Sequence, residues 1–103
     1  MTALKEYIKL ESPGIWKEGP DAQRRDVILS FGKATLVISD SLGRPLSHWS
    51  LPALQRKSRG SNVFVPDVAS TEELEITDSL MVDAIEKLQG AIQRQGNRPQ
   101  LRR

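Results

Sequence analysis

The amino-acid sequence predicts a mainly β fold, an antiparallel bent sheet or barrel with one C-terminal α-helix. Short β-branched and apolar runs follow one another between residues 15 and 77, and turn residues separate them. An amphipathic segment with helical spacing comes after the last run. The chain has 103 residues, of which 38% are apolar and 27% charged, as is typical of one small folded domain.

The predicted strands are short and are joined by residues that favour turns. A Gly-Lys-Ala sequence at residues 32–34 is typical of a hairpin connection. Residues 40–44 form a second turn, in which Gly43 stands where a positive φ is expected. Strands joined by such short connections favour antiparallel pairing. In chain order, the predicted strands are residues 15–17, 27–31, 35–39, 45–51, 62–65 and 72–77.

Alternation along two of these strands indicates which side chains face the core. In the strand at residues 45–51, Trp49 lies on one face, while Leu46 and His48 lie on the other. In the last strand, Leu74 and Ile76 face inward and alternate with carboxylates that face outward. Both patterns predict a sheet with one apolar and one polar face.

The segment after residue 77 has the spacing of an amphipathic helix. Asp78 can cap its N-terminus, and Gly96 and Asn97, followed by Pro99, end it. Its apolar stripe comprises Met81, Ala84, Ile85, Leu88, Ala91 and Ile92. Because such a helix needs a surface on which to bury its stripe, we expect it to cover an open side of the sheet. The predicted common core contains Trp49, Val37, Leu74, Ile76, Ile85 and Leu88.

This order of elements resembles the pleckstrin-homology-like superfold, in which a bent antiparallel barrel or sandwich is closed by one C-terminal helix. The resemblance covers nearly the whole chain. It implies a single domain over residues 1–96, followed by a basic extended tail at residues 97–103. Lipid-binding members usually place paired basic residues in the loop that joins their first two strands. Here residues 17–26 instead interleave basic and acidic side chains, which counts against inositide recognition.

Residues 20–28, 34–38 and 47–54, together with short matches at 98–99 and 101–102, carry a second and more local resemblance. They are similar to the N-terminal region of an uncharacterised family of bacterial membrane proteins. In that family such a segment precedes a membrane-spanning helix. The resemblance therefore implies a cytoplasmic domain at the inner face of the membrane.

The composition and motifs argue against several classes of function. The chain has no cysteine and a single histidine, His48, so it offers neither a thiol nor a histidine pair for catalysis or metal binding. The glycines form no phosphate-binding or dinucleotide motif. The acidic side chains of residues 67–78 fit no calcium loop, and we expect them to form a solvated face. With a net charge of +2 and no exposed aromatic pair on a strand, nucleic-acid binding is not favoured. We therefore predict no metal, no cofactor and no enzymatic activity.

Two basic clusters are the candidate sites for phosphate or anionic lipid. The first lies in a predicted exposed loop at residues 55–60 and comprises Arg56, Lys57 and Arg59. The second lies in the tail and comprises Arg98, Arg102 and Arg103. Basic residues just before a membrane span would follow the positive-inside rule. The alternatives are a loop and a chain terminus whose charges serve solubility alone.

The function predicted from the sequence is that of a non-enzymatic binding or regulatory module. It would be the cytoplasmic N-terminal domain of a membrane-associated protein, with an unknown protein or an anionic membrane surface as partner. The alternative is a stand-alone protein-interaction domain that binds a peptide at a sheet edge or in a groove along the helix. An enzyme is the third class, and no recognised nucleophile motif accompanies His48.

Overall fold

Seven strands and one helix make up residues 10–96, which are the residues that the computed structural model describes. The predicted mainly β class with a C-terminal helix is confirmed. The strands are β1 (Ser12–Lys17), β2 (Arg24–Phe31), β3 (Thr35–Ser39), β4 (Pro45–Ser50), β5 (Gln55–Arg56), β6 (Val63–Val65) and β7 (Glu73–Glu75). The helix is α2 (Ser79–Gly96), which ends where the sequence predicts.

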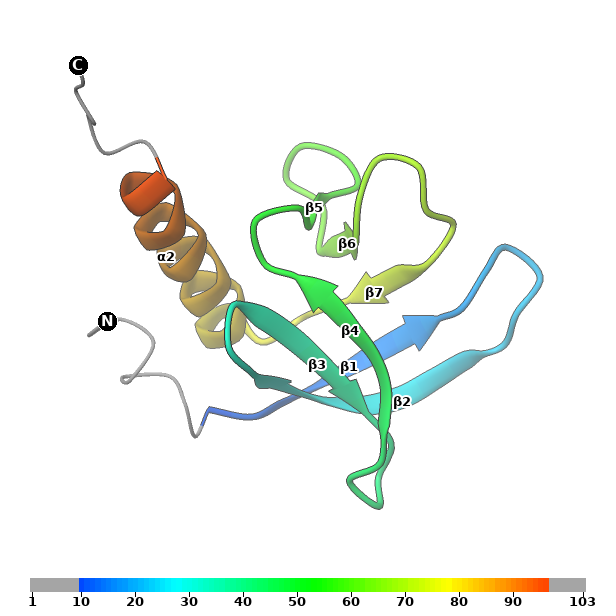
Figure 1. The fold of residues 1–103 in the computed structure, drawn as a ribbon. Helices are drawn as coiled ribbons and strands as arrows, with labels where there is room; N and C mark the ends of the chain where they lie inside the picture. The colour runs from blue at the N-terminus through cyan, green and yellow to red at the C-terminus, as the bar shows by residue number, and fades with distance from the viewer. Residues whose placement is uncertain (1–9, 97–103) are drawn as a thin grey trace.

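All seven strands belong to one antiparallel sheet with the order β4-β3-β2-β1-β7-β6-β5. β1 lies at its centre and pairs with β2 on one side and with β7 on the other. The sheet therefore consists of two meanders that meet at β1. It is strongly curled, and α2 lies beside it, as Figure 1 shows.

A single apolar core joins the sheet to the helix. It is built from the inward side chains of most strands, the segment after β4 and the inner face of α2. Five of the six predicted core residues belong to it, and Val37 is the exception. On β3 the buried apolar side chains are Leu36 and Ile38, so alternation places Val37 on the outer face, opposite His48. The prediction that Val37 belongs to the core was therefore wrong, because its neighbours Leu36 and Ile38 take the inward positions of β3.

The helix is capped and docked as its sequence predicts. The backbone N–H of Leu80 donates to Oδ1 of Asp78 at 3.0 Å, which satisfies one free donor at the helix start. Ile85 and Leu88, on the predicted stripe, are fully buried. Gln89 adds a polar connection, since its Nε2 donates to the carbonyl oxygens of both Leu51 and Leu54 at 2.8 Å. The helix is thus held against the segment that follows β4.

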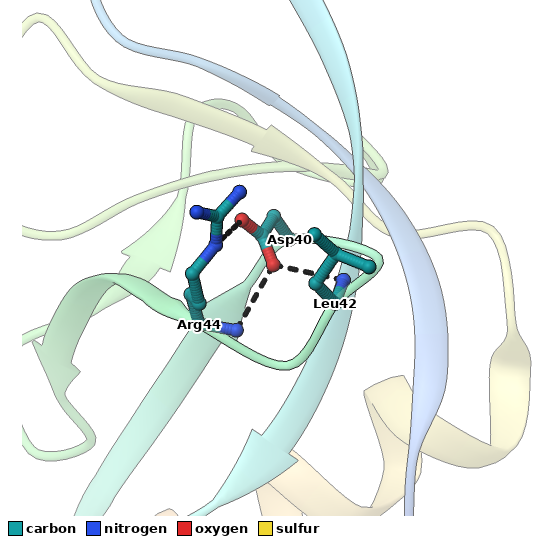
Figure 2. Close-up of polar contacts among 3 residues, drawn as sticks. All are labelled: Asp40, Leu42 and Arg44. Carbon is teal, nitrogen blue, oxygen red and sulfur yellow. Dashed lines mark hydrogen bonds and ion pairs between the residues drawn. The ribbon is translucent and has the colours of Figure 1, made fainter.

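The turn between β3 and β4 is closed by the Asp40 carboxylate (Figure 2). Its Oδ1 accepts from the backbone N–H groups of Leu42 and Arg44, each at 2.9 Å, and its Oδ2 pairs with the Arg44 guanidinium. The Arg44 backbone N–H, assisted by its guanidinium and the Leu42 N–H, holds the pKa of Asp40 below its ordinary value of 3.8. Gly43 in the same turn has the positive φ, +84°, that its position predicts.

β1 and β2 each begin three residues earlier than predicted, β7 is shorter than predicted, and two other local features also differ. Residues 55 and 56, expected in an exposed loop, form β5 and pair with β6. Where β3 pairs with β4, Ile38 lies opposite Ser47 but Ser39 lies opposite Pro45. Leu46 is therefore an extra residue of β4 in a β-bulge. The bulge breaks the alternation, and Leu46, predicted to share the outward face of His48, packs against the core instead. Within residues 10–96, no helix is long and apolar enough to cross a membrane.

Candidate functional site

The basic cluster after β4 is largely neutralised by contacts within the domain. Arg56 donates to the carbonyl oxygen of Ser61 at 2.7 Å and forms an ion pair with Glu86 of α2 at 2.9 Å. Its guanidinium also lies 5.3 Å from the centre of the Phe64 ring. Lys57 forms an ion pair with Glu73. Two of the three predicted ligands for an anion therefore already have partners.

The remaining predicted cations fall into two groups. Arg59 is exposed, and no ion pair joins it to another of the residues that the structure describes. Arg98, Arg102 and Arg103 lie outside the described residues. The structure thus leaves one exposed and unpaired guanidinium in the predicted loop cluster.

His48 lies on the outer face of β4, opposite Val37. Its side chain is exposed, and its imidazole makes no hydrogen bond or ion pair to any side chain in residues 10–96. In the same range, no group of three or more histidine, cysteine, aspartate or glutamate side chains is arranged to hold a metal ion.

A polar site that the sequence analysis missed is centred on Glu72, just before β7. Three donors converge on its Oε1: Nε1 of Trp16 at 3.0 Å, Nε1 of Trp49 at 3.1 Å and Oγ of Ser47 at 3.2 Å. Trp16 belongs to β1, and the other two belong to β4. The half-buried carboxylate therefore links the end strand of one meander to the centre of the sheet.

The two atoms of this carboxylate differ in their surroundings. Oε1 accepts three hydrogen bonds, whereas Oε2 accepts none from a described residue. No lysine or arginine among residues 10–96 forms an ion pair with Glu72. Its negative charge is stabilised by neutral donors, and one oxygen keeps its acceptor capacity.

An open cavity of about 510 Å³ lies beside Glu72. Its walls come from three parts of the chain: the end of β1 and start of β2, the first half of β4, and the loop before β7. The charged groups that line it are Glu18, Arg25 and Glu72. Arg25 lies over the Trp16 ring, 6.0 Å from its centre. The lining thus carries two carboxylates and one guanidinium.

β4 also forms one edge of the sheet, directly beside this cavity. The N–H of Leu51 donates to the carbonyl oxygen of Ala34, so the backbone groups of Leu51 point toward β3. Every second residue of β4, counted back from Leu51 as far as the bulge at Leu46, points its backbone groups the same way. By the same alternation, the N–H and C=O groups of His48 and the N–H of Ser50 point away from the sheet. These groups have no backbone partner among the described residues.

Comparison of the chain with protein-family models, with curated proteins and with solved structures finds no match in any of the three.

Proposed function

We propose that this domain is a non-enzymatic binding module that takes up an extended peptide along the free edge of β4. The observation that carries the proposal is a set of unpaired backbone groups on β4, the N–H and C=O of His48 and the N–H of Ser50. They lie on a strand, Pro45–Ser50, that has no lysine, arginine, aspartate or glutamate. A peptide strand can use such donors and acceptors to extend the sheet, so that main-chain hydrogen bonds provide affinity.

The other edge of the sheet is poorly suited to this role. β5 has only two residues, and one of them, Arg56, is charged and joined to α2 through Glu86. Short strands and charged residues are two of the means by which proteins keep an edge from pairing, and proline and β-bulges, which β4 has in its first half, are others. β4 has three times that length and carries no lysine, arginine, aspartate or glutamate. Its bulge at Leu46 limits the accessible edge to its second half.

A groove along the helix, the other peptide site expected from the sequence, is less favourable. It lies between α2 and residues 52–55 and has a volume of about 370 Å³. Gln89 crosses its floor to bond two backbone carbonyl groups. A peptide there would meet mostly polar atoms, and two of the polar side chains, Glu86 and Gln89, already have partners.

The pleckstrin-homology-like architecture is part of the same proposal. Its support is the order of elements, in which seven antiparallel strands form a curled sheet and are followed by helix α2. We also propose that the domain works in the cytoplasm at the inner face of a bacterial membrane, as the local resemblance implies. The exposed Arg59 supports contact with an anionic surface, although one such group contributes only about 1 kcal/mol.

The peptide-binding proposal is tested by blocking the edge at one backbone atom. His48→Pro removes the outward N–H without removing a hydrogen bond to β3, whereas His48→Ala changes the side chain and keeps the N–H. Peptides selected by the parent from a displayed random library should bind His48→Ala with similar affinity. They should bind His48→Pro at least tenfold more weakly.

A second measurement keeps the test valid if the proline variant does not fold. In the parent protein, the amide hydrogens of His48 and Ser50 should exchange more slowly with solvent once a selected peptide is bound. The proposal is wrong if no peptide is selected, or if bound peptides leave the exchange of both amides unchanged.

A further inference from the structure

We infer that the bound peptide carries a lysine opposite Ser47, and that its ammonium group binds the free carboxylate oxygen of Glu72. The inference rests on the proposed function and adds to it the residue type that the site selects. In peptide binding by strand addition, pockets for alternate side chains provide specificity. The cavity beside β4 is such a pocket.

The register of an added strand brings one of its side chains to Glu72. A peptide residue opposite His48 would exchange hydrogen bonds with its backbone in an antiparallel pair. The next residue along would then lie opposite Ser47, with its side chain on the same face and its Cβ about 4.5–5.5 Å from that of Ser47. Since Ser47 Oγ is 3.2 Å from Oε1 of Glu72, this peptide side chain enters the cavity at the carboxylate.

The charge of the cavity favours a cation. Two carboxylates, those of Glu18 and Glu72, line it together with the single guanidinium of Arg25. Neither carboxylate has an ion pair with another described residue. A charge-assisted hydrogen bond to Oε2 of Glu72 would use the one oxygen of that carboxylate that has no donor.

The geometry of Glu72 also favours lysine over arginine. A guanidinium binds a carboxylate most strongly through two parallel hydrogen bonds, one to each oxygen. Oε1 already accepts three donors from Trp16, Trp49 and Ser47, so this paired arrangement is not open to an arginine. An ammonium group can use Oε2 alone and direct its other N–H groups to the hydroxyl oxygens of Ser47 and Thr71 in the cavity wall.

The test compares the peptides that three proteins select from the same displayed random library. The parent should enrich lysine at one position, and Glu72→Gln should select peptides without that enrichment. Glu72→Gln keeps a carbonyl oxygen for the two indole groups and removes the charge. The matched control is Glu73→Gln, which removes a neighbouring carboxylate outside the cavity and should keep the lysine enrichment.

The best lysine peptide is then compared with versions that carry norleucine or arginine at that position. We expect each replacement to weaken binding to the parent about tenfold or more, as loss of a charge-assisted hydrogen bond predicts. Binding to Glu72→Gln should be similar for the lysine and norleucine peptides. A carbodiimide should crosslink the lysine to Glu72, as peptide mapping by mass spectrometry can show.

The outcomes separate this inference from the proposed function. Peptides that need the β4 edge but show no lysine preference, or a preference that persists in Glu72→Gln, would overturn the lysine site alone. A crosslink to Glu18 without one to Glu72 would also overturn it. Failure of every peptide to depend on the backbone of His48 would overturn the proposed function, and the lysine site with it.

Discussion

The indole N–H groups of the two tryptophans, Trp16 and Trp49, both donate to one atom, Oε1 of Glu72. Trp16 and Trp49 are at most 5% exposed, and loss of that oxygen would remove the one protein acceptor of both N–H groups among the described residues. A buried donor without a partner costs about 1–3 kcal/mol, which makes Glu72 a structural requirement for both rings. The proposed contact between a peptide lysine and Oε2 would therefore use a carboxylate that the fold already holds in place.

Asp40 is a second half-buried carboxylate, and it organises one turn. Its pKa is lowered in the folded protein, so folding favours its ionised form. The resulting stability is present above the pKa of the unfolded chain, about 4, and is lost as the pH falls through the lower folded value. Asp40→Asn should melt at a lower temperature than the parent at pH 7, and the difference should shrink by pH 2.5.

Thermal melts of both proteins between pH 7 and pH 2.5 measure this effect. Asp21→Asn, at an exposed position in the β1–β2 turn, serves as a control for the loss of one carboxylate. A melting difference between parent and Asp40→Asn that is independent of pH would show that ionised Asp40 does not stabilise the turn.

Among the elements, those with a strong local pattern could be predicted from the sequence and those defined by their neighbours could not. β3 was predicted with its observed bounds because turn residues flank a β-branched run. β5 consists of a glutamine and an arginine, which carry no strand pattern, and it exists only as the partner of β6. The inward turn of Leu46 depends on a bulge in the pairing of β3 with β4, which alternation alone does not indicate.

The candidate site was missed for a related reason. Glu72 lies two positions before Leu74 and four before Ile76, so the alternation that places those two side chains inward also places Glu72 inward. A carboxylate is ordinarily expected outside, and it was grouped with its solvated neighbours. The donors that stabilise it inside come from β1 and β4, and only the topology of the sheet brings them together.

The docking of α2 leads to a prediction at the scale of one element. Ile85 is fully buried between the helix and the sheet, so Ile85→Asp places an unpaired charge in the core. We expect a loss of about 4 kcal/mol or more in the free energy of unfolding, or failure to fold. Lys87→Asp, on the exposed side of the same helix, should change it by about 0.5 kcal/mol or less. Urea denaturation followed by tryptophan fluorescence measures the free energy of unfolding of the parent and of both variants. Similar midpoints for Ile85→Asp and the parent would contradict the docking of α2.

Across the whole molecule, the charges are arranged in blocks along the chain. Residues 67–86 carry seven acidic groups and no basic one, while residues 87–103 carry five basic groups and no acidic one. Within the described residues, Arg56–Glu86 and Lys57–Glu73 join the acidic block to the basic cluster before it. The acidic block is thereby partly neutralised inside the domain, whereas the C-terminal basic block has no acidic group within its own segment.

We predict that the chain binds anionic vesicles weakly and that salt reduces this binding. We also predict that the binding depends on residues 97–103. Each basic group contributes about 1 kcal/mol near such a surface, and screening acts over a Debye length of about 8–10 Å. Co-sedimentation should compare the full chain with one ending at Gly96, using anionic and neutral vesicles at low and physiological salt. Arg59→Gln should reduce binding by less than the truncation does. Binding that ignores lipid charge, or that persists without the tail, would exclude the tail as the membrane contact.

The central place of β1 has a consequence for how the chain reaches its fold. β1 can pair with β2 as soon as the hairpin between them forms, but its other edge has no partner strand until β7 has been made. The contact between Trp16 and Glu72 spans 56 positions in the sequence, so it must be made at the entropic cost of closing a long loop. Long-range pairing of this kind slows folding relative to local pairing. During synthesis, the middle strand of the finished sheet is therefore an open edge until all seven described strands have been made.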